Sequence, residues 1–435
     1  MELVLGIILL LTYLALIVYG FKGGNLMIGF LVLSVLWTIL GIIAGICDWQ
    51  TLNNTVLDAG PTSFGATAVY IIFGAWFACV LLQTGISGAI IKKATELGGD
   101  KPALTCILLC IVTALIFTSS YGAGAVVAIG VIVFPIMLSL GIPKVLAAGS
   151  FCMSVGCGLY LNQSLLTQAS GVMTDNFGAQ RFAEGVTKDW YPYAWACFAI
   201  HLVSVIIMVI IASKSGKKSH AWAAQAAPAD KDVPVIAMIA PLIPVVTNML
   251  FGIKMIPGII IAVIWALLWT KNFSYSKAVP IVSKTFHDGV ADVGLVLGFL
   301  LFLQMFCKAA GAVKGLIEPI VSPVFSGMST FMLFLIFGLL GFLGLYRGPL
   351  TIWGAGMATY MIVASATNLP IAVLYPLFYI ICCTINTNVC PTQSWNLWAI
   401  GYTGVDVKDF MKQTLPYALP CALVLELLGY FMWAA

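Results

Sequence analysis

The sequence predicts an all-α integral membrane protein made of two inverted-topology repeats with broken helices. The first observation is composition: 61% of the 435 residues are hydrophobic and only 8% are charged, against roughly 25% charged residues in soluble domains. The second is a set of apolar runs long enough to cross a hydrocarbon core of about 30 Å. The third is an internal offset of about 226 residues at which landmarks recur in order.

The apolar runs are expected to be helices because strands would leave backbone groups unpaired in lipid, and a barrel would need an alternation that the sequence lacks. The first run follows Met1-Glu2-Leu3, without a basic segment or a cleavage site of small residues, and is interpreted as a first span. The chain is therefore expected to cross a cell membrane several times, with candidate spans at residues 3–20, 27–47, 66–83, 190–212, 290–306, 328–345 and 414–433.

The offset pairs short motifs in the two halves of the chain. The pairs are Thr55-x-x-Asp58 with Thr285-x-x-Asp288, Gly85 with Gly311, and Gly-Ile-Pro143 with Asn368-Leu369-Pro370. Doubled helical membrane chains are typically transporters whose substrate binds between the repeats, near the bilayer midplane.

Charged residues predict the orientation of the halves. A polar linker at residues 213–233 carries four lysines and is expected in the cytoplasm. Lysines after the first and third spans are also expected in the cytoplasm, whereas the loop of residues 48–65 has no Lys or Arg and is expected outside. The N-terminus is then outside, and residues 1–212 cross the membrane an odd number of times. Residues 234–435 therefore enter the membrane from the cytoplasm, with the opposite orientation to the first half. Against this orientation stand Lys254, Lys308 and Lys314.

Each half also has an amphipathic stretch after its third span. One runs from Thr84 to Pro102 and the other from Ala310 to Pro319. Each is expected to be either a helix lying in the membrane interface or an ordinary loop helix.

Several classes of function are excluded. The sequence has no Walker loop, no H-E-x-x-H, no nucleophile elbow and no paired intramembrane Asp, so neither an enzyme nor an ATP-driven pump is predicted, and no cofactor is expected. The 12 cysteines are scattered in apolar runs and are interpreted as buried thiols. The net charge of +4 is too dispersed for nucleic-acid binding.

Two long windows hold almost no charge. Between Pro102 and Asp175 the only Asp, Glu, Lys or Arg is Lys144, and between Pro319 and Val405 it is Arg347. Intramembrane charges are costly and commonly functional. In these windows, Gly and Pro interrupt apolar runs beside polar clusters, and freed backbone groups become ligands where they line a cavity.

These clusters predict an anion site with a neighbouring cation site. Half-helix N-termini suit an anion, unwound carbonyls suit a cation, and the Arg347 fork can bind a carboxylate. The candidate substrate-binding residues are Ser119, Ser120, Tyr121, Gly122, Asn162, Gln163, Ser164, Arg347, Thr351, Asn386, Thr387, Asn388, Thr392, Gln393 and Ser394. The candidates for a coupling cation, with Na⁺ as the metal ion considered, are Asn162, Ser164, Thr384, Asn386 and Asn388.

Structural alternatives exist for each candidate. Arg347 would equally suit a backbone carbonyl or an interfacial phosphate, and the polar clusters would suit contacts between helices at about 0.6 kcal/mol each. Asp58 and Asp288, with His287, are either proton-coupling groups or solvated cap residues. Glu426 in the last span is either functional or a packing residue.

The run from Gly60 to Pro143 contains a span, then Leu-Leu-Gln-Thr-Gly-Ile-Ser-Gly-Ala-Ile-Ile, then a Gly-rich polar break and a further apolar run. It resembles the ion transporter superfamily, and within it the gluconate permease, citrate symporter and C4-dicarboxylate carrier group. The resemblance implies a secondary carrier for small organic anions, a scaffold that often forms a homodimer, and a re-entrant hairpin in each half. These regions would include residues 119–124, 160–164, 347–351 and 386–394.

The sequence thus predicts a secondary active transporter that moves a small carboxylate by alternating access, coupled to Na⁺ or H⁺. Sodium is favoured because the two windows contain no carboxylate, although gluconate-permease-like relatives favour the proton. One alternative is a cation/proton antiporter, which would need Asp58, Asp288, Asp292 or Glu426. The other is a passive anion channel.

Overall fold

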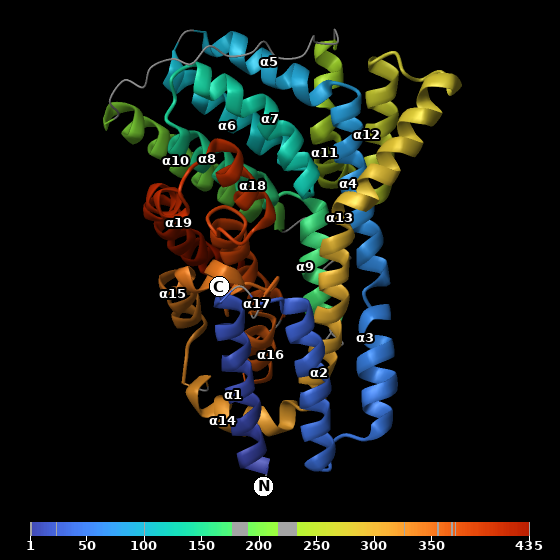
Figure 1. The fold of residues 1–435 in the computed structure, drawn as a ribbon, viewed down its shortest axis with the longest axis vertical. Coiled ribbons are helices and arrows are strands. Elements are labelled where there is room, and N and C mark those ends of the chain that lie inside the picture. Colours follow the sequence, from blue (N-terminus) through green and yellow to red (C-terminus); the bar gives the residue numbers. More distant parts are fainter. Residues whose placement is uncertain are drawn as a thin grey trace.

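The computed structural model describes residues 2–22, 24–99, 101–175, 190–215, 233–325, 327–354, 356–366, 369 and 371–434. Every regular element in these ranges is a helix (Figure 1), so the prediction of an all-helical membrane protein with broken helices is confirmed. Most of the predicted linker at 213–233, together with Asn368 and Pro370 of the last repeat landmark, lies outside the described residues.

The chain opens with two apolar helices, α1 (Glu2–Phe21) and α2 (Leu26–Ile43). Asn25 caps α2 by accepting hydrogen bonds from the backbone N–H groups of Met27 and Ile28. The expected loop of residues 48–65 is largely helical instead: η1 (Thr51–Asp58) is a π-helix that continues into α3 (Ala59–Thr62). Hydroxyls of this segment bond back to the preceding turn, as Thr62 Oγ1 does to the Asp58 carbonyl.

The remaining helices fall into two series along the chain. The first series is α4 (Gly65–Gln83), α5 (Ile86–Gly98), α6 (Pro102–Phe117), α7 (Ala123–Ser139), α8 (Lys144–Leu159), α9 (Gln163–Asp175) and α10 (Trp190–Ser215). The second is α13 (Tyr275–Ala312), α14 (Lys314–Phe325), α15 (Thr330–Leu339) with η4 (Gly341–Arg347), α16 (Gly356–Ala366), α17 (Ile371–Ile381) with η5 (Cys382–Asn386), α18 (Ser394–Thr403) and α19 (Val407–Gly429).

Three short helices separate the series, namely η3 (Val235–Leu242), α11 (Ile243–Phe251) and α12 (Met255–Trp269), and η6 (Tyr430–Ala434) ends the chain. The inverted orientation of the two halves in a membrane stays a prediction.

Sharp bends interrupt four apolar stretches. The angles are 61° between α4 and α5, 67° between α8 and α9, 46° within α13 and 58° between α15 and η4. Gly85 makes the first bend with a φ of +83°, a conformation that glycine adopts without steric cost. Counting each bent pair as one span, the described residues hold up to eight apolar spans, four of them unbroken.

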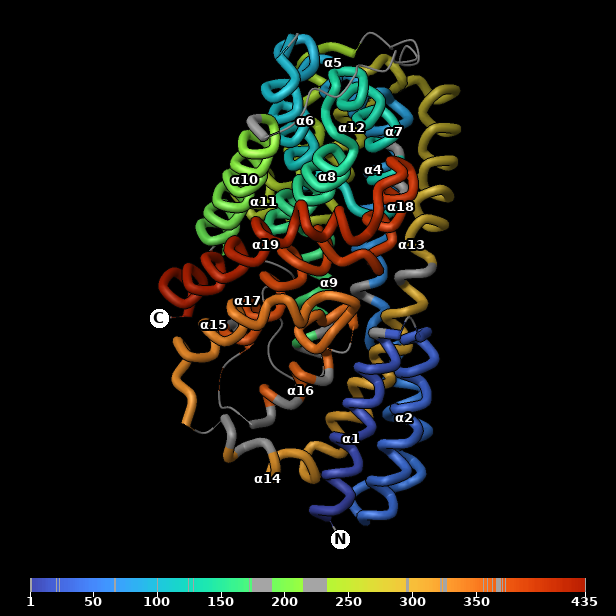
Figure 2. The backbone as a smooth tube through the Cα atoms, turned by 60° about the vertical axis from the view of Figure 1, so that its left-hand side comes forward, coloured from blue at the N-terminus to red at the C-terminus, as the bar shows by residue number. Residues whose placement is uncertain are grey.

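α13 runs along most of the molecule and contacts helices towards both ends of it (Figures 1 and 2). It packs against α4 and α2. Trp76 Nε1 of α4 donates a hydrogen bond of 3.2 Å to Thr285 Oγ1, and Phe306 stacks on Phe30 of α2 with centroids 5.3 Å apart. In both views α1 and α2 lie at the opposite end from α5, α6 and α7.

The two amphipathic stretches differ in where they begin. The first is α5, with Ile86 and Ile91 buried and Lys92 and Lys93 exposed, as an amphipathic helix requires. The second begins four residues later than expected, because Ala310 still belongs to the last turn of α13. Of the 12 cysteines, all but Cys47 and Cys79 are buried, and every one is a free thiol.

Candidate functional site

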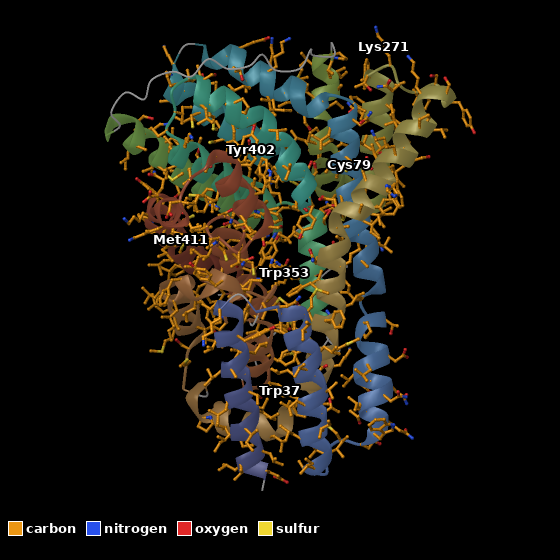
Figure 3. The ribbon with its side chains drawn as sticks, in the orientation of Figure 1. Trp37, Cys79, Lys271, Trp353, Tyr402 and Met411 are labelled. Atoms are coloured by element: carbon orange, nitrogen blue, oxygen red, sulfur yellow. The ribbon has the colours of Figure 1, made fainter. Side chains whose placement is uncertain are left out.

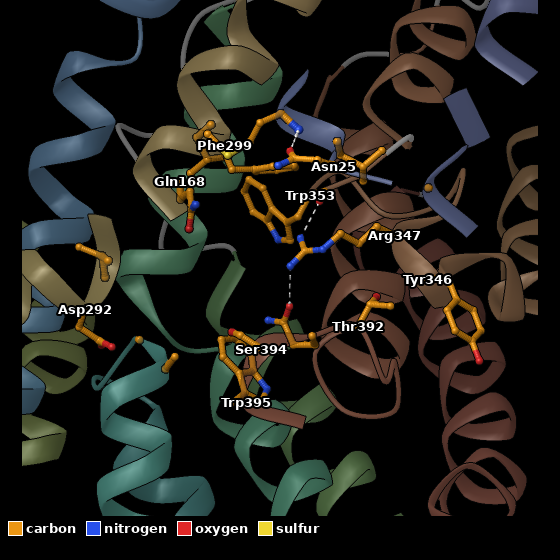
Figure 4. Close-up of a pocket in the computed structure, with 18 of the residues that line it drawn as sticks. Asn25, Gln168, Asp292, Phe299, Tyr346, Arg347, Trp353, Thr392, Ser394 and Trp395 are labelled. Atoms are coloured by element: carbon orange, nitrogen blue, oxygen red, sulfur yellow. Dashed lines mark hydrogen bonds between the residues drawn. The ribbon is translucent and has the colours of Figure 1, made fainter. Parts of the chain in front are cut away.

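A cavity of about 360 Å³ lies where the breaks of the two helix series meet (Figure 4). Its wall comes from the α1–α2 connection, the start of α7, Gln168 of α9, one face of α13, the chain after η4, and the turn before α18. In Figure 3, Trp353 of this wall lies near the middle of the long axis, whereas Lys271 lies at one end. The volume is within the range of roughly 300–1,000 Å³ for ligand pockets.

Arg347 enters the cavity from a strained turn. Tyr346 and Arg347 have φ angles of +52° and +57°, a left-handed conformation that costs non-glycine residues energy and clusters at functional sites. Two contacts hold the turn: the Tyr346 N–H donates to Cys390 Sγ at 3.0 Å, and Gly354 lies so close to the Arg347 carbonyl that a Cβ there would come within 2.2 Å of it.

The Arg347 guanidinium is oriented but not saturated. Nη1 donates to the Trp353 carbonyl at 2.9 Å, and Nη2 donates to Gln393 Oε1 at 3.3 Å. The Cζ atom lies 5.4 Å from the centroid of the Phe299 ring. Because a guanidinium has five N–H donors, donors remain for a ligand.

Three helix N-termini also reach this cavity. They are the starts of α7 at Gly122 and Ala123, of α18 at Gln393 and Ser394, and of α2 at Asn25 and Leu26. The N-cap residues Gly122 and Gln393 make no side-chain cap hydrogen bond of their own. The first N–H groups of a helix have no partner within the helix and contribute positive potential. Arg347 and the start of α18 together form a wall suited to an anion.

Asp292 of α13 supplies a negative charge to the same cavity. Gly122, with a φ of +115°, has no room for a side chain, because a Cβ there would come within 2.3 Å of Asp292 Oδ2. The carboxylate therefore lies against the N-terminus of α7. In Figure 4, Asp292 and Arg347 approach the cavity from different sides.

Sequence reasoning treated Asp292 only as a group that an antiporter could use, because it lies outside both uncharged windows. The available signal was its place in an apolar run, residues 290–306, that contains no other charged residue.

Two polar wall atoms have no hydrogen-bond partner among the described residues. They are Gln168 Oε1, on a side chain 1% exposed, and Trp353 Nε1, on a side chain 7% exposed. Leaving a buried polar atom unpaired costs about 1–3 kcal/mol. Both residues line the cavity. Neither residue was predicted as a site residue, although the sequence Trp353-Gly-Ala-Gly resembles Tyr121-Gly-Ala-Gly.

Six predicted substrate-binding residues line the cavity: Tyr121, Gly122, Arg347, Thr392, Gln393 and Ser394. Thr392 and Ser394 are exposed. The remaining nine predicted residues, Ser119, Ser120, Asn162, Gln163, Ser164, Thr351, Asn386, Thr387 and Asn388, are buried outside its wall.

Both the Nδ2 and the Oδ1 atoms of Asn162 form hydrogen bonds at the turn between α8 and α9. Nδ2 donates to the carbonyls of Phe117 and Ser120 at 2.9 and 2.8 Å, and Oδ1 accepts from the Leu165 N–H at 3.1 Å. The α8–α9 turn is thereby fixed to the break between α6 and α7. Ser119 Oγ donates to the Pro241 carbonyl.

Asn388 has a corresponding role after η5. Its Nδ2 donates to the carbonyls of Cys383 and Thr384 and lies 3.3 Å from Nε2 of buried His201, whose Nδ1 meets Tyr160 Oη at 2.9 Å. Gly156 makes room for it, because a Cβ there would come within 1.7 Å of Asn388 Oδ1. This network ties η5 to α8 and α10.

Other hydroxyls and amides of the predicted set also bond to backbone or to neighbouring side chains. Gln163 Nε2 donates to Tyr191 Oη at 2.9 Å and Thr351 Oγ1 to the Gly344 carbonyl at 2.7 Å. Thr384 and Thr387 bond the carbonyls of Ile380 and Cys383. Of the five candidate cation ligands, Ser164 Oγ and the Asn386 amide have no hydrogen-bond partner among the described residues.

The other acidic candidates lie elsewhere. Asp58 is exposed, and Asp288 is half exposed, with its Oδ1 3.6 Å from Nδ1 of His287. Glu426 is fully buried in α19, and its two oxygens have no hydrogen-bond partner among the described residues. The described residues contain no cluster of three or more His, Cys, Asp or Glu side chains suited to a metal ion.

The fold is similar to two solved transporters. The YdaH transporter of Alcanivorax borkumensis aligns with a TM-score of 0.56 and 15% identity, over 88% of each chain. MtrF of Neisseria gonorrhoeae, from a class of antimetabolite efflux pumps, aligns with a TM-score of 0.54 and 14% identity, over 90% of this chain and 84% of MtrF. No family model and no curated protein matches the sequence. At this identity the likeness concerns the fold: this chain has the fold of a membrane transporter.

Proposed function

We propose that the chain is a secondary active transporter of a small organic anion, a carboxylate, that works in a cell membrane by alternating access. The observation that carries this proposal is the Arg347 guanidinium, which faces the cavity with unused donors beside the start of α18. Planar, bidentate binding of carboxylates is the typical use of such a fork. Broken helices that meet at mid-molecule are the usual architecture of substrate sites in carriers.

The coupling ion is proposed to be Na⁺ or H⁺. Sodium is supported by the unpaired oxygens of Ser164 and Asn386. The proton is supported by Asp292, since a carboxylate in the cavity can carry one. The same carboxylate makes a cation/proton antiporter the second candidate function. An antiporter would not need Arg347 to recognise an anion, which separates the two functions.

The test uses purified protein in proteoliposomes. A panel of organic acids is first screened by thermal shift, since a ligand at 100 times its Kd stabilises by about 2.7 kcal/mol. Uptake or release of the best acid is then measured in both directions. Accumulation against its gradient distinguishes a carrier from a passive channel.

Arg347→Lys keeps the charge but loses the fork, so transport of the acid is expected to fall about 10-fold or more at unchanged expression and thermal stability. Lys144→Arg, a charge-conserving change at the exposed start of α8, is the matched control and should transport normally. Equal transport by the Arg347→Lys protein and the unmodified protein would remove Arg347 from the site and favour the antiporter.

A further inference from the structure

We infer that the transported carboxylate also carries a positively charged amine, so that the ligand is a zwitterion whose two charges are separated by an apolar spacer. The inference rests on the proposed function, because it takes the binding of a carboxylate at Arg347 as given. It adds a second recognition point, Asp292, and a reason for the aromatic side chains in the cavity wall.

The first argument is charge balance. Arg347 and Asp292 are the formally charged side chains in the cavity wall, so the wall is neutral overall. A ligand with a single negative charge would make the occupied cavity negative overall, which is less favourable where water is excluded. A zwitterion places one charge against each side chain and keeps the occupied cavity neutral.

The second argument is that Asp292 is held in place. Its Oδ2 occupies the space that a side chain at position 122 would fill, and the N-terminus of α7 stabilises a negative charge there. The carboxylate also lines the cavity, so it can accept hydrogen bonds from an ammonium group.

The third argument is the hydrogen-bonding character of the two unpaired wall atoms, one a donor and the other an acceptor. Trp353 Nε1 is a donor and belongs to the segment whose carbonyl binds Arg347, so it suits a carboxylate oxygen. Gln168 Oε1 is an acceptor and suits an ammonium N–H. In Figure 4, Gln168 lies on the Asp292 side of Trp353. The unpaired donor therefore lies towards Arg347 and the unpaired acceptor towards Asp292, as a ligand with a carboxylate at one end and an amine at the other requires.

Aromatic side chains share the cavity wall with the two charged side chains. Phe299, Trp353, Trp395 and Tyr121 all line the cavity, and Tyr121 meets Trp395 edge to face at 6.5 Å. Aromatic faces suit both an apolar spacer and a neighbouring cation. A carboxylate and an amine at the two ends of a short or aromatic spacer fit this arrangement.

The test compares matched compounds by isothermal titration calorimetry on the purified full chain. One set is 4-(aminomethyl)benzoate, 4-methylbenzoate and 4-methylbenzylamine; the other is 4-aminobutyrate, butyrate and butylamine. In at least one set, the zwitterion is expected to bind at least about 10-fold more tightly than either compound with a single charge.

The Asp292→Asn variant should lose that preference. Zwitterion binding is expected to weaken about 10-fold or more, whereas the matched carboxylate should bind as well as before or about 3-fold better, because the wall then carries a net positive charge. Retained carboxylate binding also reports that the variant is folded. Asp292→Glu keeps the charge and should keep part of the preference. Asp288→Asn, one helical turn earlier and half exposed, is the matched control and should bind like the unmodified protein.

Two sets of results would overturn the inference, and they differ in what they say of the proposed function. If carboxylates bind as tightly as their zwitterions, or if Asp292→Asn leaves the ranking unchanged, while Arg347→Gln still weakens carboxylate binding, the inference fails and the proposed function stands. If no carboxylate in either set binds, or if Arg347→Gln has no effect on those that do, both fail.

Discussion

Single residues in this protein show how little freedom the cavity wall has. Arg347 projects from two consecutive left-handed residues, and such strain of about 1–3 kcal/mol per residue persists only where the surroundings compensate for it. Asp292 depends on a glycine on another helix. The sequence identified Arg347 through its isolation in an apolar window and gave Asp292 only as an antiporter candidate, because only the folded chain brings α13 to the start of α7.

Gly122→Ala tests the close approach of Asp292 to Gly122. An alanine would be strained at a φ of +115° and would collide with Asp292 Oδ2, so the protein should lose about 1–3 kcal/mol of stability and most of its transport. Thermal denaturation and proteoliposome uptake measure the two effects. Gly88→Ala, in the middle of α5 with no atom near its Cβ position, is the control and should be neutral or stabilising by about 0.4–1 kcal/mol. Equal behaviour of the two variants would contradict the proposed contact.

At the scale of elements, most of the helices could be predicted, and so could the breaks beside Ser120 and Asn162. The bends within α13 and between α15 and η4 instead lie inside the predicted spans 290–306 and 328–345, and the contacts of the polar residues could not be predicted. Apolar run lengths located α1, α2, α4 and α10 to within a few residues. The clusters at Asn162 and Asn388 were correctly placed beside breaks, yet their amides bond chiefly to backbone carbonyls. Sequence shows that a polar group lies at a break, but not whether it satisfies the broken backbone or faces a cavity.

Asn162→Ala tests this structural role. The change leaves the buried carbonyls of Phe117 and Ser120 without the donors they have now, and each such loss costs about 1–3 kcal/mol. A lower thermal denaturation midpoint is expected even without ligand or sodium. Asn53→Ala, which removes an exposed asparagine from η1, should leave the midpoint unchanged. A normal midpoint for Asn162→Ala, combined with lost sodium dependence of transport, would instead favour a role in cation binding.

At the scale of the whole molecule, the two helix series each contribute a break to one cavity, and the coupling ion is the property that remains open to experiment. The preference for sodium rested on the lack of carboxylates in two windows of sequence, and Asp292 reaches the cavity from outside both. The fold itself resembles transporters of less than a sixth sequence identity, so neither the substrate nor the ion follows from the likeness.

Imposed gradients decide between the ions. In proteoliposomes with equal pH on both sides, an inward sodium gradient should drive accumulation of the acid if Ser164 and Asn386 bind sodium, and Asn386→Ala should then abolish that dependence. If a pH gradient in sodium-free buffer drives accumulation fully, the sodium assignment is wrong, and Asp292→Asn should uncouple transport from the pH gradient. The two outcomes use different variants, so each result is checked independently.

The bend in α13 has a mechanical consequence for this arrangement. The arm from Tyr275 to the bend at Gly294 has about 20 residues and is therefore about 30 Å long. A change of about 10° in the bend would swing its far end by about 5 Å, whereas Asp292, two residues from the fulcrum, would scarcely move. α13 can thus act as a lever whose pivot coincides with the charge in the cavity: the outer end can travel far enough to open or close a path, while the distance from Asp292 to Arg347 stays nearly constant.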